Sequence, residues 1–313
     1  MSSPSVSIIV PARDPGAYLR EAIDSVSAQT HDDWELVVVD DGSSEDLSWV
    51  PSSDRRVRLL RTTPQGVSSA RNLGIAETTG ELVAFLDADD RWHPRKLERQ
   101  VAAMEPGVPF SYTAFDLVNA AGERTGPGYG GAVGYLDMLR GNLGILQSSV
   151  VARREALYRC GLYDPLLTLQ EDLDLFLRLA RTGDGLYLES VEVDYRQHES
   201  NASTAYWEAM HALLDIYRVH EAAARRSGDG AAIAAVHEGR RAVRYTYGWK
   251  AIDSARSALH DHRGRDTTVA LVRAISASPR AVAVSARRLL IDRSPFSASR
   301  ARTPGRTPDT PSR

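Results

Sequence analysis

The sequence predicts an α/β protein with a mostly parallel central sheet flanked by helices and followed by a C-terminal helical extension. Two observations predict this class. Short apolar runs alternate with segments of helical periodicity through the first half of the chain, and these runs are continuously apolar, as in strands buried on both faces. From about residue 206 the composition changes to Ala- and Arg-rich helix.

The elements of the first half follow from these patterns in chain order. We expect strands at 5–10, 34–39, 57–60 and 82–86. We expect helices at 17–29 and 67–77, and a third helix that carries Leu97, Val101 and Met104 on one stripe. Strands that alternate with helices in this way indicate a parallel sheet covered on both faces.

The second half is less regular. Residues 119–135 are rich in glycine and contain Pro127, which predicts a loop. Beyond this loop the patterns indicate an apolar run at 145–152, a helix at 171–181, a strand at 186–195, and helices at 206–226, 231–260 and 266–291. We therefore divide the chain into a domain at 1–205, a helical region at 206–293 and a tail at 294–313. The tail is expected to be disordered because it lacks apolar residues for a core.

Composition bounds the class of protein. The chain has 313 residues, of which 42% are hydrophobic and 25% charged, and it has a single cysteine, Cys160. These values predict a globular protein of a reducing cytoplasm without an internal disulfide framework. The first residues lack the pattern of a signal peptide, and no apolar stretch is long enough to span a membrane. We expect no nucleic-acid partner.

Charge is distributed unevenly along the chain. Residues 1–205 hold 19 Lys and Arg against 31 Asp and Glu, whereas residues 206–313 hold 19 against 10. The acidic part is suited to a metal ion. The basic part is suited to an anionic membrane surface or an acidic polymer, and packing on the other domain or a homodimer contact is the alternative use of these helices. We expect a cytoplasmic protein, with peripheral association at the inner face of the plasma membrane as a hypothesis.

Polar side chains follow three of the predicted strands at the point where each strand ends. Asp87, Asp89 and Asp90 follow the run at 82–86, Pro11 to Asp14 follow the first strand, and Asp40-Asp41 follow the second. Ligand sites in parallel sheets form at the carboxyl ends of the strands, so we expect these clusters to share one crevice. Carboxylates placed there suit a hard divalent cation.

The order of these motifs resembles glycosyltransferase family 2, whose members have the GT-A fold. The matching pieces span about the first 200 residues and read VSIIVPARDPGAYLREAIDSVSAQT (6–30), WELVVVDDGSSED (34–46), GVSSARNLGIAETTGELVAFLDADDRWHPRKLERQ (66–100), SSVVARREALYRCGLYDP (148–165), QEDLDLFLRLARTG (170–183) and YRQHESNAS (195–203). The resemblance implies an inverting enzyme that transfers a sugar from a nucleotide diphosphate donor, most simply a UDP-sugar, to a hydroxyl acceptor. It also implies Mg²⁺ or Mn²⁺ as a Lewis acid for the departing diphosphate.

The resemblance assigns roles to the donor and metal residues. Asp87 is expected to face the ribose and sugar, and Asp89 to bind the metal. The pocket for the base is expected from Pro11, Ala12, Arg13 and Asp14 together with Asp41, and Arg71 is expected to reach the nucleotide, with ion pairing to a glutamate as its alternative. Asp40 is expected to cap its turn, and Asp90 to cap the following helix. Arg13 stands where the family usually has an aromatic residue, so dTDP and GDP remain open as alternatives to UDP.

The resemblance also assigns the chemistry of the acceptor. Asp172 is expected to be the general base that deprotonates the acceptor hydroxyl, and Glu171 to orient the acceptor. Their position at a helix N-terminus favours the ionised carboxylate, and helix capping is the alternative role. His198 is interpreted as a further metal ligand or as a surface or core histidine, and Trp92 as an acceptor contact or a core residue.

Two other functions remain open. A sugar-nucleotide pyrophosphorylase would share the α/β architecture, but residues 11–17 lack the glycine-rich phosphate loop that it would need. A non-catalytic module that binds nucleotide sugars would have no need for Asp172. The motifs do not identify the acceptor, which is a saccharide, a lipid-linked molecule or a small molecule.

Overall fold

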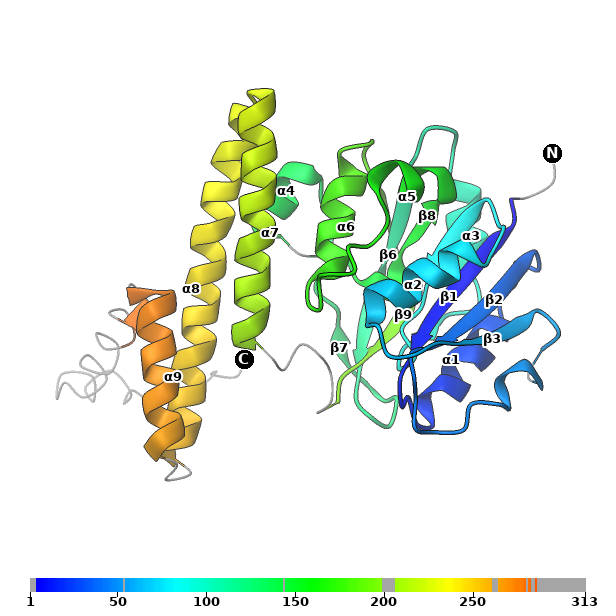
Figure 1. The fold of residues 1–313 in the computed structure, drawn as a ribbon, viewed down its shortest axis with the longest axis horizontal. Helices are drawn as coiled ribbons and strands as arrows, with labels where there is room; N and C mark the ends of the chain where they lie inside the picture. The colour runs from blue at the N-terminus through cyan, green and yellow to red at the C-terminus, as the bar shows by residue number, and fades with distance from the viewer. Residues whose placement is uncertain are drawn as a thin grey trace, which may run out of the picture. The chain divides into compact units, whose positions relative to one another are not determined.

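The structure is a computed structural model that describes residues 4–52, 54–142, 144–198, 206–260, 264–279, 281–282 and 285. Its contacts divide the chain into two compact units, residues 1–242 and residues 243–313, and each is described by itself. The larger unit contains a sheet of nine strands, and Figure 1 shows its helices arranged around that sheet. The predicted boundaries at 205 and 293 stay predictions, and the predicted tail lies outside the described residues.

The first four strands form a parallel half-sheet in the order β3-β2-β1-β4. They are β1 (Val6–Ala12), β2 (Trp34–Asp40), β3 (Val57–Arg61) and β4 (Leu82–Phe85). Helix α1 (Tyr18–Ser27) connects β1 to β2, and α2 (Val67–Ala76) connects β3 to β4. The predicted α/β class is confirmed, and the carboxyl ends of β1, β2 and β4 lie at one edge of the sheet.

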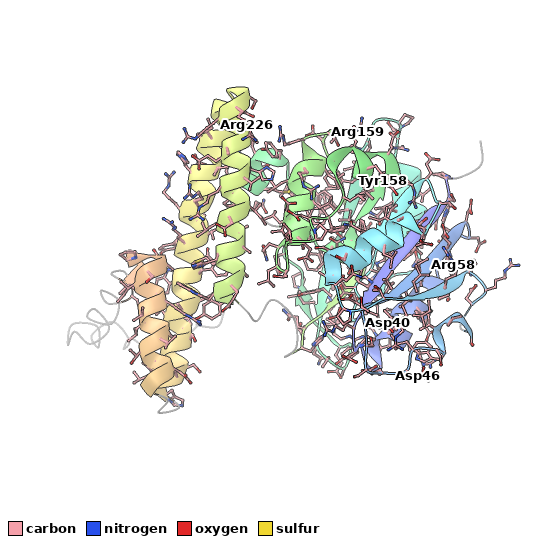
Figure 2. All side chains as sticks on the ribbon, viewed as in Figure 1. Asp40, Asp46, Arg58, Tyr158, Arg159 and Arg226 are labelled. Atoms are coloured by element: carbon pink, nitrogen blue, oxygen red, sulfur yellow. The ribbon has the colours of Figure 1, made fainter. Side chains whose placement is uncertain are left out.

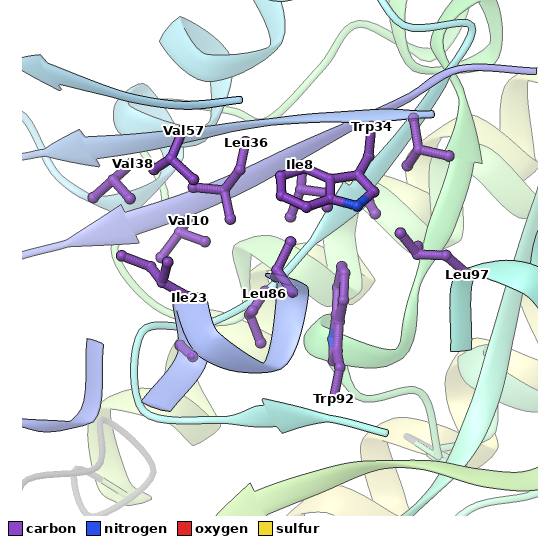
Figure 3. Close-up of a cluster of buried hydrophobic side chains, with 14 of the residues drawn as sticks. Ile8, Val10, Ile23, Trp34, Leu36, Val38, Val57, Leu86, Trp92 and Leu97 are labelled. Atoms are coloured by element: carbon purple, nitrogen blue, oxygen red, sulfur yellow. The ribbon is translucent and has the colours of Figure 1, made fainter. Parts of the chain in front are cut away.

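Alternating side chains of β1 and β2 explain why these runs are continuously apolar. Ile8 and Val10 of β1 belong to the same buried cluster as Ile23 of α1 (Figure 3), whereas Val39 of β2 belongs to a cluster with Ala70 of α2. The two faces of the sheet are therefore both covered by helices, and each face needs apolar residues. The α2 helix lies so close to its face that a Cβ atom at Gly74 would stand 2.5 Å from the side chain of Ile9.

The second half of the sheet is mixed. Its strands are β5 (Arg91–Trp92), β6 (Phe110–Val118), β7 (Arg124–Pro127), β8 (Val151–Arg153) and β9 (Leu186–Arg196). Strand β8 runs antiparallel to β4 and β6, and β9 runs parallel to β6 and antiparallel to β5. The sequence pattern predicts no strand for the residues of β6 and a loop for those of β7. Polar residues interrupt β6 and glycine occupies β7, so neither gives the continuous apolar signal of the first half.

Four further helices of the larger unit lie beside this mixed half. They are α3 (Lys96–Ala103), α4 (Tyr135–Leu139), α5 (Arg154–Cys160) and α6 (Glu171–Ala180), with single 3₁₀ turns at Val50–Ser52 and Gln147–Ser149. Helix α5 ends at Gly161, which takes the left-handed conformation at φ 95°. Gln170, which precedes α6, also has a positive φ of 61°, and this tight turn aims the first residues of α6.

Three helices follow the sheet. They are α7 (Tyr206–Ser227), α8 (Gly230–His260) and α9 (Gly264–Ala277), close to the bounds predicted for the first two. Helix α7 packs against α4, where the Tyr217 hydroxyl donates to the carbonyl of Met138 at 2.9 Å. Helix α8 crosses from the larger unit into the smaller one. Among the described residues, no helix is both long and apolar enough to cross a bilayer.

Candidate functional site

The site begins at the carboxyl end of β2, where Asp40 and Asp41 follow the strand. Asp40 is fully buried and its Oδ1 accepts a hydrogen bond from the amide of Ser43 at 2.7 Å, which confirms its predicted role in the turn. Both oxygens of Asp41 accept backbone N–H groups, from Gln65 at 2.7 Å and Gly66 at 2.8 Å. Asp41 therefore holds the loop that leads into α2. Figure 2 labels Asp40 on the same side of the unit as Asp46 of the following loop.

The end of β1 is tied to this loop through Asp14. Its Oδ1 accepts hydrogen bonds from the amide and the hydroxyl of Ser44, both at 2.7 Å, and its own amide donates to the Ser43 hydroxyl. These hydrogen bonds hold the pKa of Asp14 below its usual value. Pro11 is half-buried, Ala12 is buried, and Arg13 is exposed at the surface. Asp14 is thus bound to the loop that follows β2, and the carbonyl of Ala12 accepts the amide of Asp41.

Arg71 of α2 joins two of the predicted clusters. Its guanidinium is 4% exposed and donates to Asp87 Oδ1 through one terminal nitrogen and to Glu171 Oε1 through the other, both at 2.8 Å. The aspartate after β4 and the start of α6 are therefore held by a single planar cation. Glutamate pairing was the alternative proposed for Arg71, and it is present here together with the contact to Asp87.

The ring of Tyr163 lies against the Arg71 guanidinium, a contact that the sequence did not indicate. Its ring centre lies 5.3 Å from the Arg71 guanidinium carbon, and its backbone N–H and C=O are both hydrogen-bonded to the side chain of Asn72. In the S-A-R-N motif, Asn72 thus fixes the backbone of Tyr163. The neighbouring Arg71 holds the two carboxylates described above. The Arg71 Nε and the Tyr163 hydroxyl are buried and have no hydrogen-bond partner within the described part of the chain.

Asp89 lies beside His198. The Asp89 Oδ2 lies 2.9 Å from His198 Nε2, and the imidazole stacks on the ring of Tyr18 with 5.3 Å between ring centres. Burial, and then the negative charge of Asp87, raise the pKa of Asp89. A divalent cation would offset the cost that burial and the charge of Asp87 impose on ionised Asp89, so the arrangement of Asp89 and His198 fits one.

The described residues alone do not complete a cation site. No group of three or more His, Cys, Asp or Glu side chains with metal-binding geometry occurs in the part of the chain that the structure describes. Asp89 and His198 supply one carboxylate oxygen and one imidazole nitrogen. A six-coordinate cation would need its other ligands from water or from the phosphate oxygens of a nucleotide.

Asp90 does not cap the helix that follows it, and that prediction is wrong. The cap position of α3 is Arg95. Asp90 is instead fully buried, where it accepts the Ser148 hydroxyl at 2.5 Å and the backbone N–H of Arg196 at 3.0 Å. These bonds fasten the aspartate loop to the 3₁₀ turn and to the end of β9, which carries the chain toward His198.

Glu171 and Asp172 begin α6 directly beside Arg71. Asp172 is partly buried, and its Oδ1 accepts the amide of Leu173 at 2.7 Å. Burial, followed by the charge of Glu171, raises the pKa of Asp172 to about 7, while Arg71 acts in the opposite direction. The helix N-terminus favours the ionised form, as expected, but desolvation and the neighbouring carboxylate outweigh it. A carboxylate with this pKa is a stronger base than an ordinary aspartate.

Trp92 lies in the core. Its side chain is 4% exposed, its indole N–H donates to the carbonyl of Ser148 at 2.8 Å, and the Lys96 ammonium lies 4.1 Å from the ring centre. In Figure 3 the indole stands beside Leu86 and Leu97 of the same buried cluster. The structure therefore favours the core interpretation of Trp92 over contact with an acceptor.

Comparison with known proteins places this site in a family. Residues 7–161 match the model of glycosyl transferase family 2. The chain belongs to this family. The putative teichuronic acid biosynthesis glycosyltransferase TuaG of Bacillus subtilis is 29% identical over 225 residues, which are 69% of this chain and 88% of that protein. The resemblance read from the motifs is confirmed.

Other relatives match over shorter stretches. An uncharacterised glycosyltransferase of Rickettsia felis is 38% identical over 122 residues. The match spans 38% of this chain and 20% of that protein. A UDP-Glc:alpha-D-GlcNAc-diphosphoundecaprenol beta-1,3-glucosyltransferase of Escherichia coli, WfgD, is 36% identical over 118 residues, 36% of this chain and 47% of that protein.

A solved structure shares the fold. The mannosyltransferase PcManGT of Pyrobaculum calidifontis, crystallised with GDP-Man and Mn²⁺, superposes with a TM-score of 0.59 and 18% identity, covering 95% of this chain and 83% of that one. At this identity the likeness concerns the fold alone, and it confirms the expected GT-A architecture with its C-terminal helices.

Proposed function

We propose that this protein transfers a sugar from a nucleoside diphosphate donor to an acceptor hydroxyl with inversion at the anomeric carbon, and that it acts in the synthesis of a cell-surface polysaccharide or glycoconjugate. The observation that carries the proposal is the double contact of Arg71. One guanidinium holds both Asp87, which is proposed to face the donor, and Glu171, which adjoins the proposed base Asp172, and this supports donor and acceptor chemistry at one position. Family membership supports the same reaction.

Asp172 acts as the base in this proposal. Its carboxylate takes the proton of the acceptor hydroxyl while the hydroxyl oxygen attacks the anomeric carbon. The bond from that carbon to the phosphate oxygen breaks on the opposite face, and the nucleoside diphosphate leaves. A pKa of about 7 allows Asp172 to be ionised at neutral pH and still to bind the proton well. Glu171, which Arg71 orients, is proposed to position the acceptor.

Asp89 and His198 are proposed to hold a divalent cation together with the donor diphosphate. Bound Mg²⁺ or Mn²⁺ supplies Lewis-acid stabilisation of the leaving diphosphate. Asp87 is proposed to face the ribose and sugar, with Asp41 and residues 11–14 near the base. The observed hydrogen bonds of Asp41 and Asp14 also give these residues a second task, because they keep the loops around the base pocket in one conformation.

A UDP-sugar is the proposed donor, as for WfgD by its name, with GDP- and dTDP-sugars as the alternatives. PcManGT takes GDP-Man, and the exposed Arg13 does not distinguish between these bases. The names of TuaG and WfgD place those proteins in teichuronic acid synthesis and in transfer to a lipid diphosphate. A lipid-linked or polysaccharide acceptor is therefore proposed over a small molecule.

A panel of nucleotide sugars, each with and without Mn²⁺, tests the donor. A bound ligand raises the unfolding temperature through RT ln(1 + [L]/Kd), so the cognate donor should produce the largest shift, and the shift should depend on Mn²⁺. Slow release of nucleoside diphosphate from that donor supports a transferase. Release of pyrophosphate from a nucleoside triphosphate and a sugar phosphate would instead make the protein a pyrophosphorylase. No shift with any donor would contradict the proposal.

The cation ligands are tested by His198→Ala. We expect the apparent Mn²⁺ affinity, measured in the presence of the best donor, to fall about tenfold because one nitrogen ligand is lost. His93→Ala is the matched control, since His93 Nε2 also lies 3.0 Å from a carboxylate, that of Asp194, on strand β9. An unchanged affinity in His198→Ala would remove this histidine from the metal site.

A further inference from the structure

Helix α9 places its small and large apolar residues in an unusual way. Its alanines, Ala270, Ala274 and Ala277, are 0–4% exposed. Its large apolar residues are 44–58% exposed: Val269, Leu271, Val272 and Ile275, which we call the α9 outer face. A helix of a soluble domain normally buries its large apolar side chains and leaves smaller or polar ones outside.

The packing of the smaller unit explains why these side chains stay outside. Helix α9 lies beside the end of α8 (Figure 1), and the side of α8 that is buried there carries Ala251, Ala255 and Ala258. Gly248 of α8 approaches closely enough that a Cβ atom would stand 2.8 Å from that of Ser278. Because alanine and glycine are small, the two helices pack closely and leave no space between them for large side chains. The large side chains at positions 269 to 275 point away from it.

The outer face carries no charge of its own, but the segment around it is strongly basic. Residues 261–313 contain eleven arginines and four aspartates, with no lysine or glutamate. An uncharged apolar stripe within an arginine-rich segment is the composition of helices that lie in the interface of a membrane. Such helices insert apolar side chains between the lipids while basic residues meet anionic headgroups, and each basic residue near the surface adds attraction.

A second copy of the chain is a poorer occupant for this face. Residues 261–313 carry a net positive charge in each copy, and this charge disfavours the association of two copies through this unit. Four side chains that are each about half exposed also offer far less than the roughly 800 Å² per partner that a stable protein interface buries. An anionic bilayer has a charge opposite to that of residues 261–313. It also does not require the contact area that a stable protein–protein interface buries.

We propose that the α9 outer face binds the surface of an anionic membrane and holds the protein there as a peripheral protein. The bilayer receives Val269, Leu271, Val272 and Ile275, and the net positive charge of the sequence at 261–313 favours anionic lipids. The surface is independent of the donor and of the base, so a failure of this inference leaves the proposed glycosyl transfer untouched.

Co-sedimentation of the full chain with vesicles tests the inference. The vesicles are phosphatidylcholine alone and phosphatidylcholine with phosphatidylglycerol. We expect binding to the anionic vesicles only, and we expect Val272→Asp combined with Ile275→Asp to reduce it at least about tenfold, since two carboxylates replace the apolar contact and repel the headgroups. Val219→Asp is the matched control, because Val219 is an apolar residue of α7 that is 63% exposed.

The outcomes separate the alternatives. Loss of vesicle binding in the double variant and normal binding in Val219→Asp would support the proposal, provided that circular dichroism shows unchanged helix content. Equal binding of the double variant and the unmodified chain would overturn it, as would the absence of binding to either vesicle. A dimer in sedimentation velocity that the double variant converts to a monomer, with vesicle binding unaffected, would assign the face to a second copy.

Discussion

Replacement of Asp172 by Asn should abolish transfer and at the same time stabilise the fold. The carboxylate of Asp172 has a pKa of about 7 instead of the 3.8 of an ordinary aspartate, because burial and the neighbouring Glu171 disfavour its charge. Above pH 7 the folded protein therefore contains an ionised group that would be more stable in the unfolded chain. Asparagine keeps the shape and can still accept the amide of Leu173, but it carries no charge.

The magnitude follows from the two pKa values. Each pH unit between them corresponds to about 1.36 kcal/mol, so the full cost of the charge is about 4 kcal/mol above pH 7. It is less than half of that at pH 5, where the folded group is protonated, and it vanishes below pH 3.8, where both states are protonated. Asp172 is only partly buried, and water screens its charge. We therefore expect a gain of about 1–2 kcal/mol in the free energy of unfolding at pH 8.

Urea denaturation of the metal-free protein at pH 8 and pH 5 measures this gain, and a donor-binding assay and a transfer assay accompany it. Asp164→Asn is the matched control, because Asp164 is exposed and also accepts one backbone N–H, that of Leu166. Asp172→Asn should bind donor normally, lose transfer, and gain more stability at pH 8 than at pH 5. Near-normal turnover would remove Asp172 from the role of base. A gain that is zero, or that is the same at both pH values, would refute the electrostatic argument.

Three further predictions concern the same site and the core beside it. The value of kcat/KM should fall about tenfold per pH unit below pH 7, since Asp172 must be ionised, and Glu171→Gln should move this acid limb to lower pH by removing the adjacent charge; an unmoved limb would contradict the coupling. Arg71→Lys should lower kcat/KM about a hundredfold, because an ammonium cannot hold two carboxylates in one plane, whereas Arg58→Lys, at an exposed ion pair, should stay within about twofold; equal effects would contradict the bridge. Trp92→Ala should cost about 3–5 kcal/mol in urea denaturation, and a loss of acceptor affinity with unchanged stability would return Trp92 to the acceptor site.

Local patterns were sufficient for the parallel half of the sheet. Strands β1 to β4 are apolar throughout, and the helices between them have clear periodicity, so their bounds differ from the predicted ones by two residues or fewer at most ends. Strands β6 and β7 escaped prediction because polar residues or glycine break their apolar pattern. Strand β6 is placed by pairing with β8 and β9, which are distant in the sequence, and β7 is placed by pairing with β6.

Local sequence indicates where some residues of the candidate site stand, but not which distant residues they contact. The sequence places Asp87, Asp89 and Asp172 after a strand or at a helix start, which is local information. It contains no signal for the partner of Asp90, since Ser148 and Arg196 are 58 and 106 positions away. It also could not place Trp92, because an indole that follows an acidic turn is compatible with a crevice wall and with a core.

The sequence by itself determined the family, which strands along the chain are followed by acidic residues, and the residue types available for binding a diphosphate and a cation. Tertiary structure alone decided that Arg71 holds Asp87 and Glu171 together across 16 and 100 positions of the chain, and that the pKa of Asp172 is raised. The physical reason is that burial and the distances between charges are set by the packed fold, whereas strand and helix preferences are set by neighbouring residues along the chain.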